Sequence, residues 1–295
     1  MERRQYHTAV YDTARWEGFS TRPGDIFVCT PPKCGTTWMQ TIVASLLWPA
    51  GDLPGPVLAI SPWIEMKIMP APDMHAMLAA QTHRRFMKSH TPADGIPWFD
   101  DARYIFVARD GRDAFMSFCN HTEQFSDELR ESLNAQAPDG VTHLPAWDGD
   151  VHGFFANWLK EDELLFGHVA TFWAERHRPN LHLVHYNDLK ADLGGEMRRI
   201  AEFIGADVPA ECWPAVVERC TFEAMRADEA RVGVLDLVFK GGLKSFVFKG
   251  TNGRWRDVLT PDELAAYDRR VAETLPRECA AGLEHGRCAL AGARG

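Results

Sequence analysis

The chain has 295 residues, of which 45% are hydrophobic and 25% charged, a composition typical of a globular protein with a large core. Its formal net charge of −9 argues against nucleic acid as a partner, because binding to a polyanion depends on basic patches. Seven cysteines without a Cys-x-x-Cys pair argue against a disulfide framework and structural zinc. The histidines form no His-Glu-x-x-His pattern, so we predict no catalytic metal.

The N-terminal region contains no recognisable targeting segment. Residues 1–7 lead into polar sequence without an apolar signal core. The longest apolar run, near residues 42–48, is too short to span a bilayer. We therefore expect a cytoplasmic protein without a transmembrane segment.

The first predicted strand leads through a short turn into a predicted helix. Residues 25–29 are a β-favouring apolar run, and apolar side chains recur at helical spacing over residues 38–47. Pro49 stops that helix, and we expect Thr36 or Thr37 to cap its start.

The turn between them has the features of an anion site. Helix N-termini present unpaired N–H groups and a partial positive charge. Gly35 lets the backbone approach a ligand closely, and Lys33 adds a full charge. A Walker A loop does not fit, because here the lysine precedes the glycine. A cysteine phosphatase loop does not fit either, because the residue six positions after Cys34 is Gln40 and not an arginine. The turn therefore predicts a phosphate-type ligand.

The heptapeptide over residues 32–38 carries a family resemblance. It reads Pro-Lys-Cys-Gly-Thr-Thr-Trp and resembles the 5′-phosphosulfate loop of the cytosolic-type sulfotransferases, usually Pro-Lys-Ser-Gly-Thr-Thr-Trp. Those enzymes use 3′-phosphoadenosine 5′-phosphosulfate, PAPS, and release 3′,5′-adenosine bisphosphate, PAP. The resemblance implies that Lys33 stabilises the leaving group and that the loop binds the cofactor through Lys33, Cys34, Gly35, Thr36, Thr37 and Trp38.

A second motif ends the next predicted strand, residues 85–88. Lys88, Ser89 and His90 are similar to the Lys-Thr-His of the same family. The resemblance implies that His90 is the general base that removes the acceptor hydroxyl proton, and that Lys88 steadies the transferring sulfuryl oxygens.

A third motif follows the predicted strand at residues 104–108, just before a predicted helix at 114–119. Arg109 and Ser117 have the spacing of the pair that contacts the 3′-phosphate in the family. Arginine suits this role, because its planar fork makes bidentate contacts with phosphate.

Later segments resemble the adenine side of the family's site and its last loop. By that resemblance the adenine contacts are Tyr186, Cys220, Phe222 and Met225, and the last loop contributes Phe248, Lys249 and Gly250. Phe248 stands where the family places an arginine, so we expect a weaker grip on the cofactor unless Lys244, Lys249 or Arg254 compensates. Residues 233–253 have a composition suited to a mobile cover.

The remaining elements define the expected fold. A strand is predicted at residues 181–185, helices at 164–173 and 189–204, and a long surface excursion at 125–153 with an amphipathic piece at 127–133. Alternating strands and helices favour an α/β fold with a central parallel sheet flanked by helices on both faces. We expect one P-loop-like domain over residues 1–295, with the motifs in about residues 25–260.

These motifs together predict a sulfotransferase acting on a small acceptor. The acceptor is expected to be an apolar or aromatic hydroxyl compound: a phenol, an alcohol, a steroid-like molecule or a glycolipid. Its pocket would be lined by aromatic residues among Trp63, Trp98, Phe125, Trp147, Phe154 and Phe155, for which core packing is the alternative. A catalytically silent nucleotide-binding protein and an ATP-dependent small-molecule kinase stay open as alternatives, as does the oligomeric state.

Overall fold

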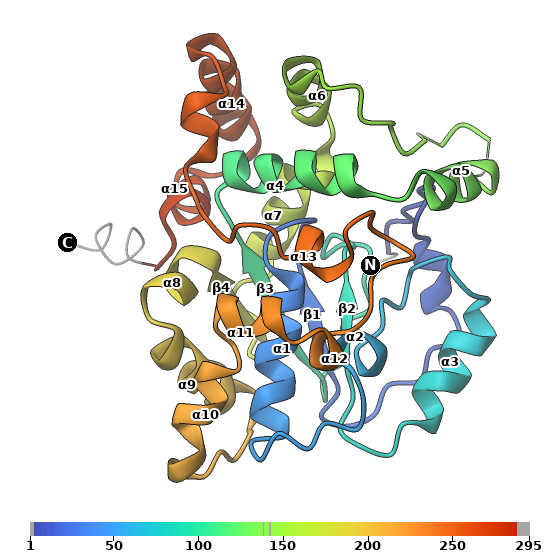
Figure 1. Cartoon of the computed structure of the whole chain (residues 1–295), viewed down its shortest axis with the longest axis vertical. Coiled ribbons are helices and arrows are strands. Elements are labelled where there is room, and N and C mark those ends of the chain that lie inside the picture. The colour runs from blue at the N-terminus through green and yellow to red at the C-terminus, as the bar shows by residue number, and fades with distance from the viewer. Residues whose placement is uncertain (1–2, 138, 142, 288–295) are drawn as a thin grey trace.

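The fold is a four-stranded parallel sheet between two layers of helices (Figure 1). It is seen in a computed structural model that describes residues 3–137, 139–141 and 143–287. The strands are β1 (Ile26–Cys29), β2 (Phe86–Ser89), β3 (Arg103–Ala108) and β4 (Leu181–His185). Their order in the sheet is β2-β1-β3-β4, and all neighbouring pairs are parallel. The predicted α/β fold is confirmed.

Fifteen α-helices and four short 3₁₀ helices surround the sheet in the described part of the chain. The α-helices are α1 (Thr36–Leu47), α2 (Val57–Ile60), α3 (Ala71–Ala80), α4 (Gly111–Gln124), α5 (Asp127–Ala135), α6 (Val151–Trp158), α7 (Phe166–Ala174), α8 (Tyr186–Ala191), α9 (Leu193–Ile204), α10 (Trp213–Glu218), α11 (Phe222–Ala227), α12 (Glu229–Val232), α13 (Gly242–Phe246), α14 (Pro261–Thr274) and α15 (Arg277–His285). The 3₁₀ helices are η1 (Thr13–Trp16), η2 (Asp162–Leu164), η3 (Ala210–Cys212) and η4 (Arg254–Asp257).

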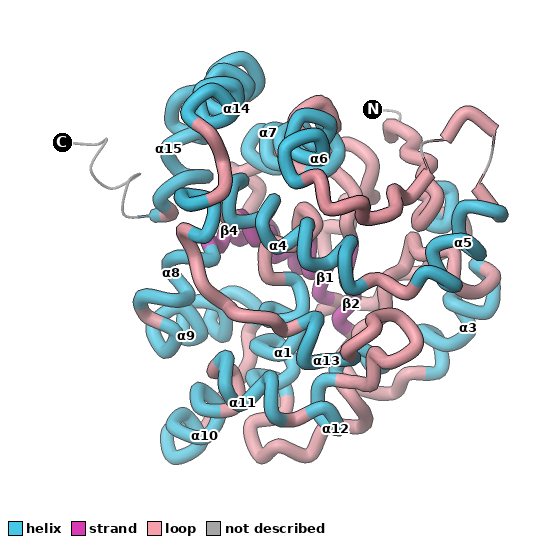
Figure 2. Tube along the Cα trace, turned by 45° about the horizontal axis from the view of Figure 1, so that its top comes forward, coloured by secondary structure: helices cyan, strands magenta, loops and turns pink. Residues whose placement is uncertain are grey.

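Alternation along the short strands builds a core on each face of the sheet. Ile26 and Val28 of β1 point toward α1 and α9, in a cluster that includes Ile42 and Ile200. The intervening side chain, Phe27, belongs to the other cluster, which is completed from α4, α6, α7, α14 and α15. Figure 2 shows the sheet between these two helix layers. Strands covered on both faces explain why the strand sequences are apolar throughout.

Three predicted helices differ in extent from the observed ones. The helix expected at 189–204 is two helices, because Asp192 leaves the helical conformation and its side chain accepts a hydrogen bond from the Gly195 N–H, which caps α9. The helix expected at 114–119 begins earlier, at Gly111, because Asp110 caps it. The helix expected from residue 164 begins at Phe166, after the 3₁₀ turn η2.

The expected excursion after α4 contains α5 and the start of α6, and α5 includes the predicted amphipathic piece. Residues 138 and 142 of that excursion lie outside the described residues. Among the described helices, none combines the length and apolar character that a membrane crossing requires.

Candidate active site

The loop between β1 and α1 leaves a helix N-terminus open. Gly35, with φ of 103°, is the N-cap of α1, and no side chain caps this end. The prediction that Thr36 or Thr37 caps the helix was therefore wrong, because the Thr36 hydroxyl lies 2.6 Å from the Thr30 hydroxyl instead. Lys33, with φ of 68°, is the single non-glycine residue at positive φ in the described chain. The loop backbone turns sharply and presents N–H groups as an anion-binding helix start does.

Cys34 lies in this loop as a buried thiol. Burial raises its pKa to about 12, so it is protonated at neutral pH. Its side chain belongs to the core cluster on the α4 side of the sheet, with Phe27 and Ala114. This environment explains why the position tolerates cysteine in place of a polar serine, and it gives Cys34 no nucleophilic role.

His90 follows β2 directly and has the tautomer that a general base needs. Its Nδ1 lies 2.8 Å from the Thr30 carbonyl oxygen, so Nδ1 carries the proton and donates it. The Nε2 atom therefore carries the lone pair. Burial, and next the charge of Lys88, lower the pKa of His90 well below 6.5. His90 is thus a neutral imidazole near pH 7, held edge-on to Trp63 with ring centroids 4.7 Å apart.

A buried carboxyl group fixes the strand end that carries His90. Glu65 accepts hydrogen bonds from the hydroxyls of Ser89 and Thr91 and from the indole N–H of Trp16. Burial raises the pKa of Glu65, so its protonated form is favoured relative to an exposed carboxyl group. Nothing in the sequence motif singled out this residue.

Two lysines lie at the ends of β1 and β2 without a carboxylate partner. The Lys33 ammonium lies 3.4 Å from His121 Nδ1 and 4.3 Å from the centre of the Phe246 ring. The Lys88 ammonium lies 5.1 Å from the centre of the Trp63 ring. Burial lowers the pKa of Lys33 to about 7 and that of Lys88 to about 8. Neither forms a salt bridge with any described residue.

Arg109, at the end of β3, donates hydrogen bonds only to neutral oxygen atoms among the described residues. Its guanidinium donates to the carbonyls of Lys33 and Thr251, at 3.4 and 3.3 Å, and to Asn252 Oδ1 at 2.8 Å. The guanidinium also lies 4.2 Å from the centre of the Tyr186 ring. Its Nε is buried and has no hydrogen-bond partner among the described residues. Such an unsatisfied buried cation fits an anionic ligand.

Arg254 is a second guanidinium beside Arg109. Burial, and next the charge of Arg109, lower the pKa of Arg254. Its Nη2 donates to the Met116 carbonyl at 3.2 Å, adjacent in sequence to Ser117, and its Nε is also buried without a partner among the described residues. Ser117 itself is half-buried on α4. An arginine from the last loop thus lies near Arg109 and contacts the turn of α4 that carries Ser117.

Tyr186 and Trp38 form an aromatic corner next to the phosphate loop. Their ring centroids are 5.0 Å apart, edge to face, and the Trp38 indole N–H donates to the Cys220 carbonyl at 2.7 Å. A methyl group at Gly35 would come within 3.0 Å of the Tyr186 ring. The corner is therefore packed directly against the open end of α1.

Two of the other expected adenine contacts, Phe222 and Met225, belong to α11. Phe222 begins α11, and its ring lies so close to Gly250 that a Cβ there would be 2.5 Å away. The Gly250 carbonyl accepts a hydrogen bond from the Lys190 ammonium at 2.7 Å. Met225 differs, because it is buried in a small apolar cluster with Val232 and Leu243.

The last loop places Phe248 between two cations. The Lys249 ammonium lies 5.0 Å from the centre of the Phe248 ring, and the Arg254 guanidinium lies 5.6 Å from it. Lys249 and Lys244 are exposed, whereas Arg254 is half-buried and close to Arg109. Among the three residues considered as substitutes for the family arginine, Arg254 has the suitable surroundings.

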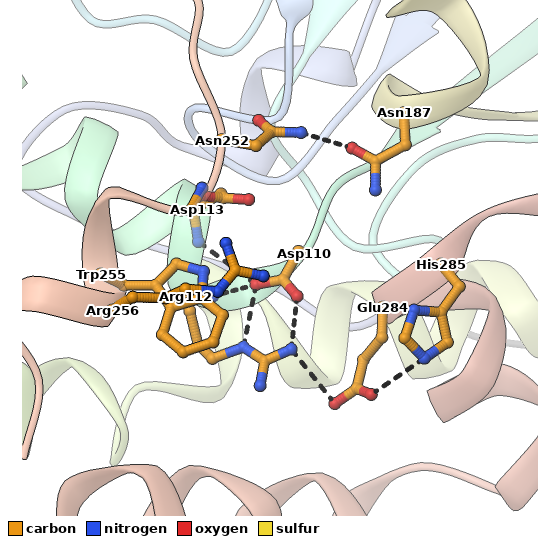
Figure 3. A pocket seen from close by; sticks show the side chains of 10 residues that line it. Asp110, Arg112, Asp113, Asn187, Asn252, Trp255, Arg256, Glu284 and His285 are labelled. Carbon is orange, nitrogen blue, oxygen red and sulfur yellow. Dashed lines mark hydrogen bonds and ion pairs between the residues drawn. The ribbon is translucent and has the colours of Figure 1, made fainter. Parts of the chain in front are cut away.

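A polar pocket lies beside the last loop, which lines it with Asn252, Gly253 and Trp255 (Figure 3). Arg112 pairs there with Asp110 at 2.6 Å and approaches Glu284 of α15 at 3.7 Å, and Asn252 donates to Asn187 at 2.6 Å. These polar groups satisfy one another. The Asn252–Asn187 hydrogen bond therefore joins the last loop to α8, and the Arg112–Glu284 contact joins α4 to α15.

Only some of the expected aromatic residues reach the site. Trp63 lies beside His90, and Phe125 lies 5.6 Å from His121. Trp98 packs against Tyr104, and Phe155 is fully buried against Phe115 in the core. Trp147 packs on Phe154, which stacks in turn on Phe118 of α4 and so forms an outer layer.

Sequence reasoning missed the aromatic group around His121. His121 lies on α4 four residues after Ser117, so it is on the same helical face. Its ring contacts Phe118, Phe239 and Phe246, with centroid distances of 6.0, 4.9 and 6.3 Å. The spacing from Ser117 was the available signal for His121.

The fold and the site together define an anion-handling α/β protein. An open helix N-terminus, four cations without a salt bridge to any described residue and a histidine with a free Nε2 converge at the carboxyl ends of parallel strands. No group of three or more potential metal ligands occurs among the described residues.

Comparison with known proteins identifies the family. The model of the sulfotransferase domain family matches residues 23–277, and the chain therefore belongs to the sulfotransferase family. A glycolipid sulfotransferase of Mycobacterium bovis is 31% identical over 316 residues, which cover 96% of this chain and 94% of that protein. Human sulfotransferase 1C2 is 26% identical over 263 residues, covering 85% of this chain and 83% of that protein.

Solved structures share the fold. Retinol dehydratase in a complex with retinol and PAP aligns with a TM-score of 0.70 and 21% identity, covering 90% of this chain and 87% of the other. Mouse sulfotransferase SULT7A1 complexed with PAP also gives 0.70, with 19% identity and coverage of 94% and 92%. The resemblance seen in the sequence motifs is thereby confirmed at the level of family and fold.

Proposed function

We propose that this protein transfers a sulfuryl group from PAPS to the hydroxyl group of a small acceptor and releases PAP. The observation that carries the proposal is the set of four cations without a salt bridge to any described residue, Lys33, Lys88, Arg109 and Arg254, around a base-competent His90. A site of this charge and geometry suits an anion with two separated acidic groups.

The residues present fit the two ends of PAPS. The open N-terminus of α1 and Lys33 suit the 5′-phosphosulfate. Arg109, with its unpaired Nε, suits the 3′-phosphate together with Ser117 and Arg254. The rings of Tyr186 and Trp38 near Gly35, and of Phe222 near Gly250, offer surfaces for adenine.

Sulfuryl transfer leaves the protein with positioning and charge neutralisation as its main tasks. His90 would accept the acceptor hydroxyl proton on Nε2, while the Thr30 carbonyl holds the opposite side of the ring. Lys33 would neutralise the charge that develops on the leaving group. Lys88 would do the same for the transferring oxygens.

The acceptor is proposed to be an apolar or aromatic hydroxyl compound. Trp63 lies beside His90 on one side, and the group of Phe125, Phe239 and Phe246 lies around His121 on the other. Aromatic walls suit phenols, steroid-like alcohols and the apolar part of a glycolipid. The similar mycobacterial protein is named for glycolipids, which makes them the first acceptors to test. A cytoplasmic location and a single domain stay predictions from the sequence.

The test is incubation with PAPS and a mixed panel of phenols, sterols, simple alcohols and glycolipids, with PAP release and sulfated product both measured. We expect equal amounts of PAP and sulfated product with at least one acceptor. PAP binding without product for any acceptor would support the silent nucleotide-binding protein. ATP turnover with a phosphorylated product would support the kinase.

A further inference from the structure

His121 is a second histidine in the site, and it contacts the lysine of the phosphate loop. Its Nδ1 lies 3.4 Å from the Lys33 ammonium. His121 belongs to α4, whereas Lys33 belongs to the loop before α1, so the contact joins two separate elements. The family motifs assign His121 no role.

The chemistry of the pair determines which atom carries the proton. When Lys33 is charged, its ammonium only donates hydrogen bonds, so Nδ1 of His121 is then the acceptor and is unprotonated. The neutral ring then carries its proton on Nε2. Burial, and next the charge of Lys33, lower the pKa of His121 well below 6.5, which agrees with a neutral imidazole.

Phe246 is the second side chain that contacts the ammonium. Its ring centre lies 4.3 Å from Lys33 Nζ, within the range of a cation–π interaction. Phe246 ends α13, in the segment expected to cover the site, and the rings of His121 and Phe246 lie 6.3 Å apart.

We propose that His121 is a positioning residue that holds the Lys33 ammonium in its charged form before substrates bind. The proposal deepens the proposed function, because it rests on Lys33 serving the anionic co-substrate. Because Lys33 has no carboxylate partner among the residues that the structure describes, it depends on a lone pair and a π face for stabilisation of its charge. His121 supplies the lone pair.

The surroundings of Lys33 make this support necessary. Lys88 from β2 and Arg109 from the end of β3 both oppose the charge of Lys33, and His90 lies nearby as a neutral ring. Cys34 gives Lys33 little help, because its own pKa of about 12 keeps the thiol protonated and uncharged. Since a hydrogen bond to the charged form raises a lysine pKa, loss of the His121 acceptor lowers the pKa of Lys33.

The test measures the pKa of Lys33 directly in the substrate-free protein. Competitive acetylation over a series of pH values, read by peptide mass spectrometry, gives the reactivity of Lys33 alone. Three variants are compared with the wild type. His121→Phe keeps the ring and removes the acceptor, His121→Asn restores an acceptor oxygen close to the place of Nδ1, and His152→Phe changes an exposed histidine on α6.

We expect an apparent pKa of about 7 for Lys33 in the wild type. His121→Phe should lower it by about 0.5–1 unit, the size of a partly exposed hydrogen bond to a charged group. His121→Asn and His152→Phe should leave it near the wild-type value. The alkaline limb of kcat/KM for PAPS should move to lower pH by the same amount in His121→Phe alone.

An unchanged pKa of Lys33 in His121→Phe would overturn the inference, as would an equal decrease in His121→Asn. Thermal unfolding checks that each variant is folded, and His121→Leu replaces His121→Phe if the latter does not fold. The acetylation result does not depend on turnover. A shifted pKa of Lys33 together with no sulfated product would support the role of His121 and reject the proposed function. An unchanged pKa of Lys33 together with sulfated product would reject the role of His121 and support the proposed function.

Discussion

At the scale of single residues, the lysines at the strand ends set the pH range of the site. Burial lowers the pKa of Lys33 to about 7 and that of Lys88 to about 8 in the free protein. A lysine is charged below its pKa, and kcat/KM reports groups of the free enzyme. We therefore predict that kcat/KM for PAPS falls as the pH rises through 7 and 8.

The acid limb of a second profile, kcat/KM for the acceptor, belongs to His90. Its pKa is lowered well below 6.5, so the neutral base persists to lower pH than for an exposed histidine. The acid limb should lie below pH 6.5, measured with the acceptor varied at saturating PAPS. If kcat/KM for PAPS stayed level above both lysine pKa values, this result would contradict the assignment of charged lysines to the co-substrate.

The substitution of Phe248 for the family arginine makes a residue-scale prediction about Arg254. Arg254→Ala should weaken PAP binding by about 10- to 100-fold, because a hydrogen bond to a charged group contributes about 1.5–3 kcal/mol. Lys249→Ala is the matched control, since Lys249 is exposed and an exposed charge contributes little. Calorimetry measures both. Unchanged PAP binding in Arg254→Ala would show that another residue compensates for the family arginine replaced by Phe248.

At the scale of elements, the open start of α1 depends on the conformation of Gly35. A side chain at φ of 103° is strained, and at this position it would also meet the Tyr186 ring at 3.0 Å. We predict that Gly35→Ala weakens PAP binding about 10-fold, since a distortion costing about 1.4 kcal/mol changes a binding constant tenfold.

The control for Gly35→Ala separates backbone strain from damage to the site. Gly149 has φ of 87°, a methyl group added to it would meet no atom within 4 Å, and it lies in the excursion before α6. Gly149→Ala should therefore change stability and leave PAP binding at the wild-type value. Equal loss of PAP binding in both variants would show that the loop of α1 has no special role.

The elements also show what the sequence can and cannot reveal. The strand, turn and helix around Lys33 were predictable, because their signals are local. Gly35 as N-cap was not, since the Thr36 hydroxyl is engaged by Thr30, which lies before the turn. The groups around His121 come from α4 and from residues 239–246, and only tertiary folding brings them together.

At the scale of the whole molecule, α15 contacts two elements that carry residues of the site, α4 and β4. Arg112 approaches Glu284 of α15, and the side chain of His185, at the end of β4, lies 2.8 Å from the Leu283 carbonyl. Leu283 itself is only 2% exposed and belongs to the core on the α4 side of the sheet. The helix therefore links the end of β4 to the start of α4.

A matched pair of leucines tests this anchoring. Leu283→Ala should lower the free energy of unfolding by about 2–5 kcal/mol, because it leaves a cavity in the core. Leu237→Ala should change it by less than about 0.5 kcal/mol, since Leu237 is 88% exposed. Urea unfolding followed by circular dichroism measures both. Similar changes in the free energy of unfolding for the two variants would show that α15 does not contribute to the core.

The central claim is sulfuryl transfer with His90 as the base, and single-turnover transfer tests it most directly. PAPS is bound first, an acceptor identified in the panel is added, and sulfated product and PAP are followed together in the wild type and in His90→Ala. We predict equal amounts of both products in the wild type. In His90→Ala, PAP binding should persist and the transfer rate should fall by about 10²–10⁴. Wild-type transfer rates in His90→Ala would contradict the account.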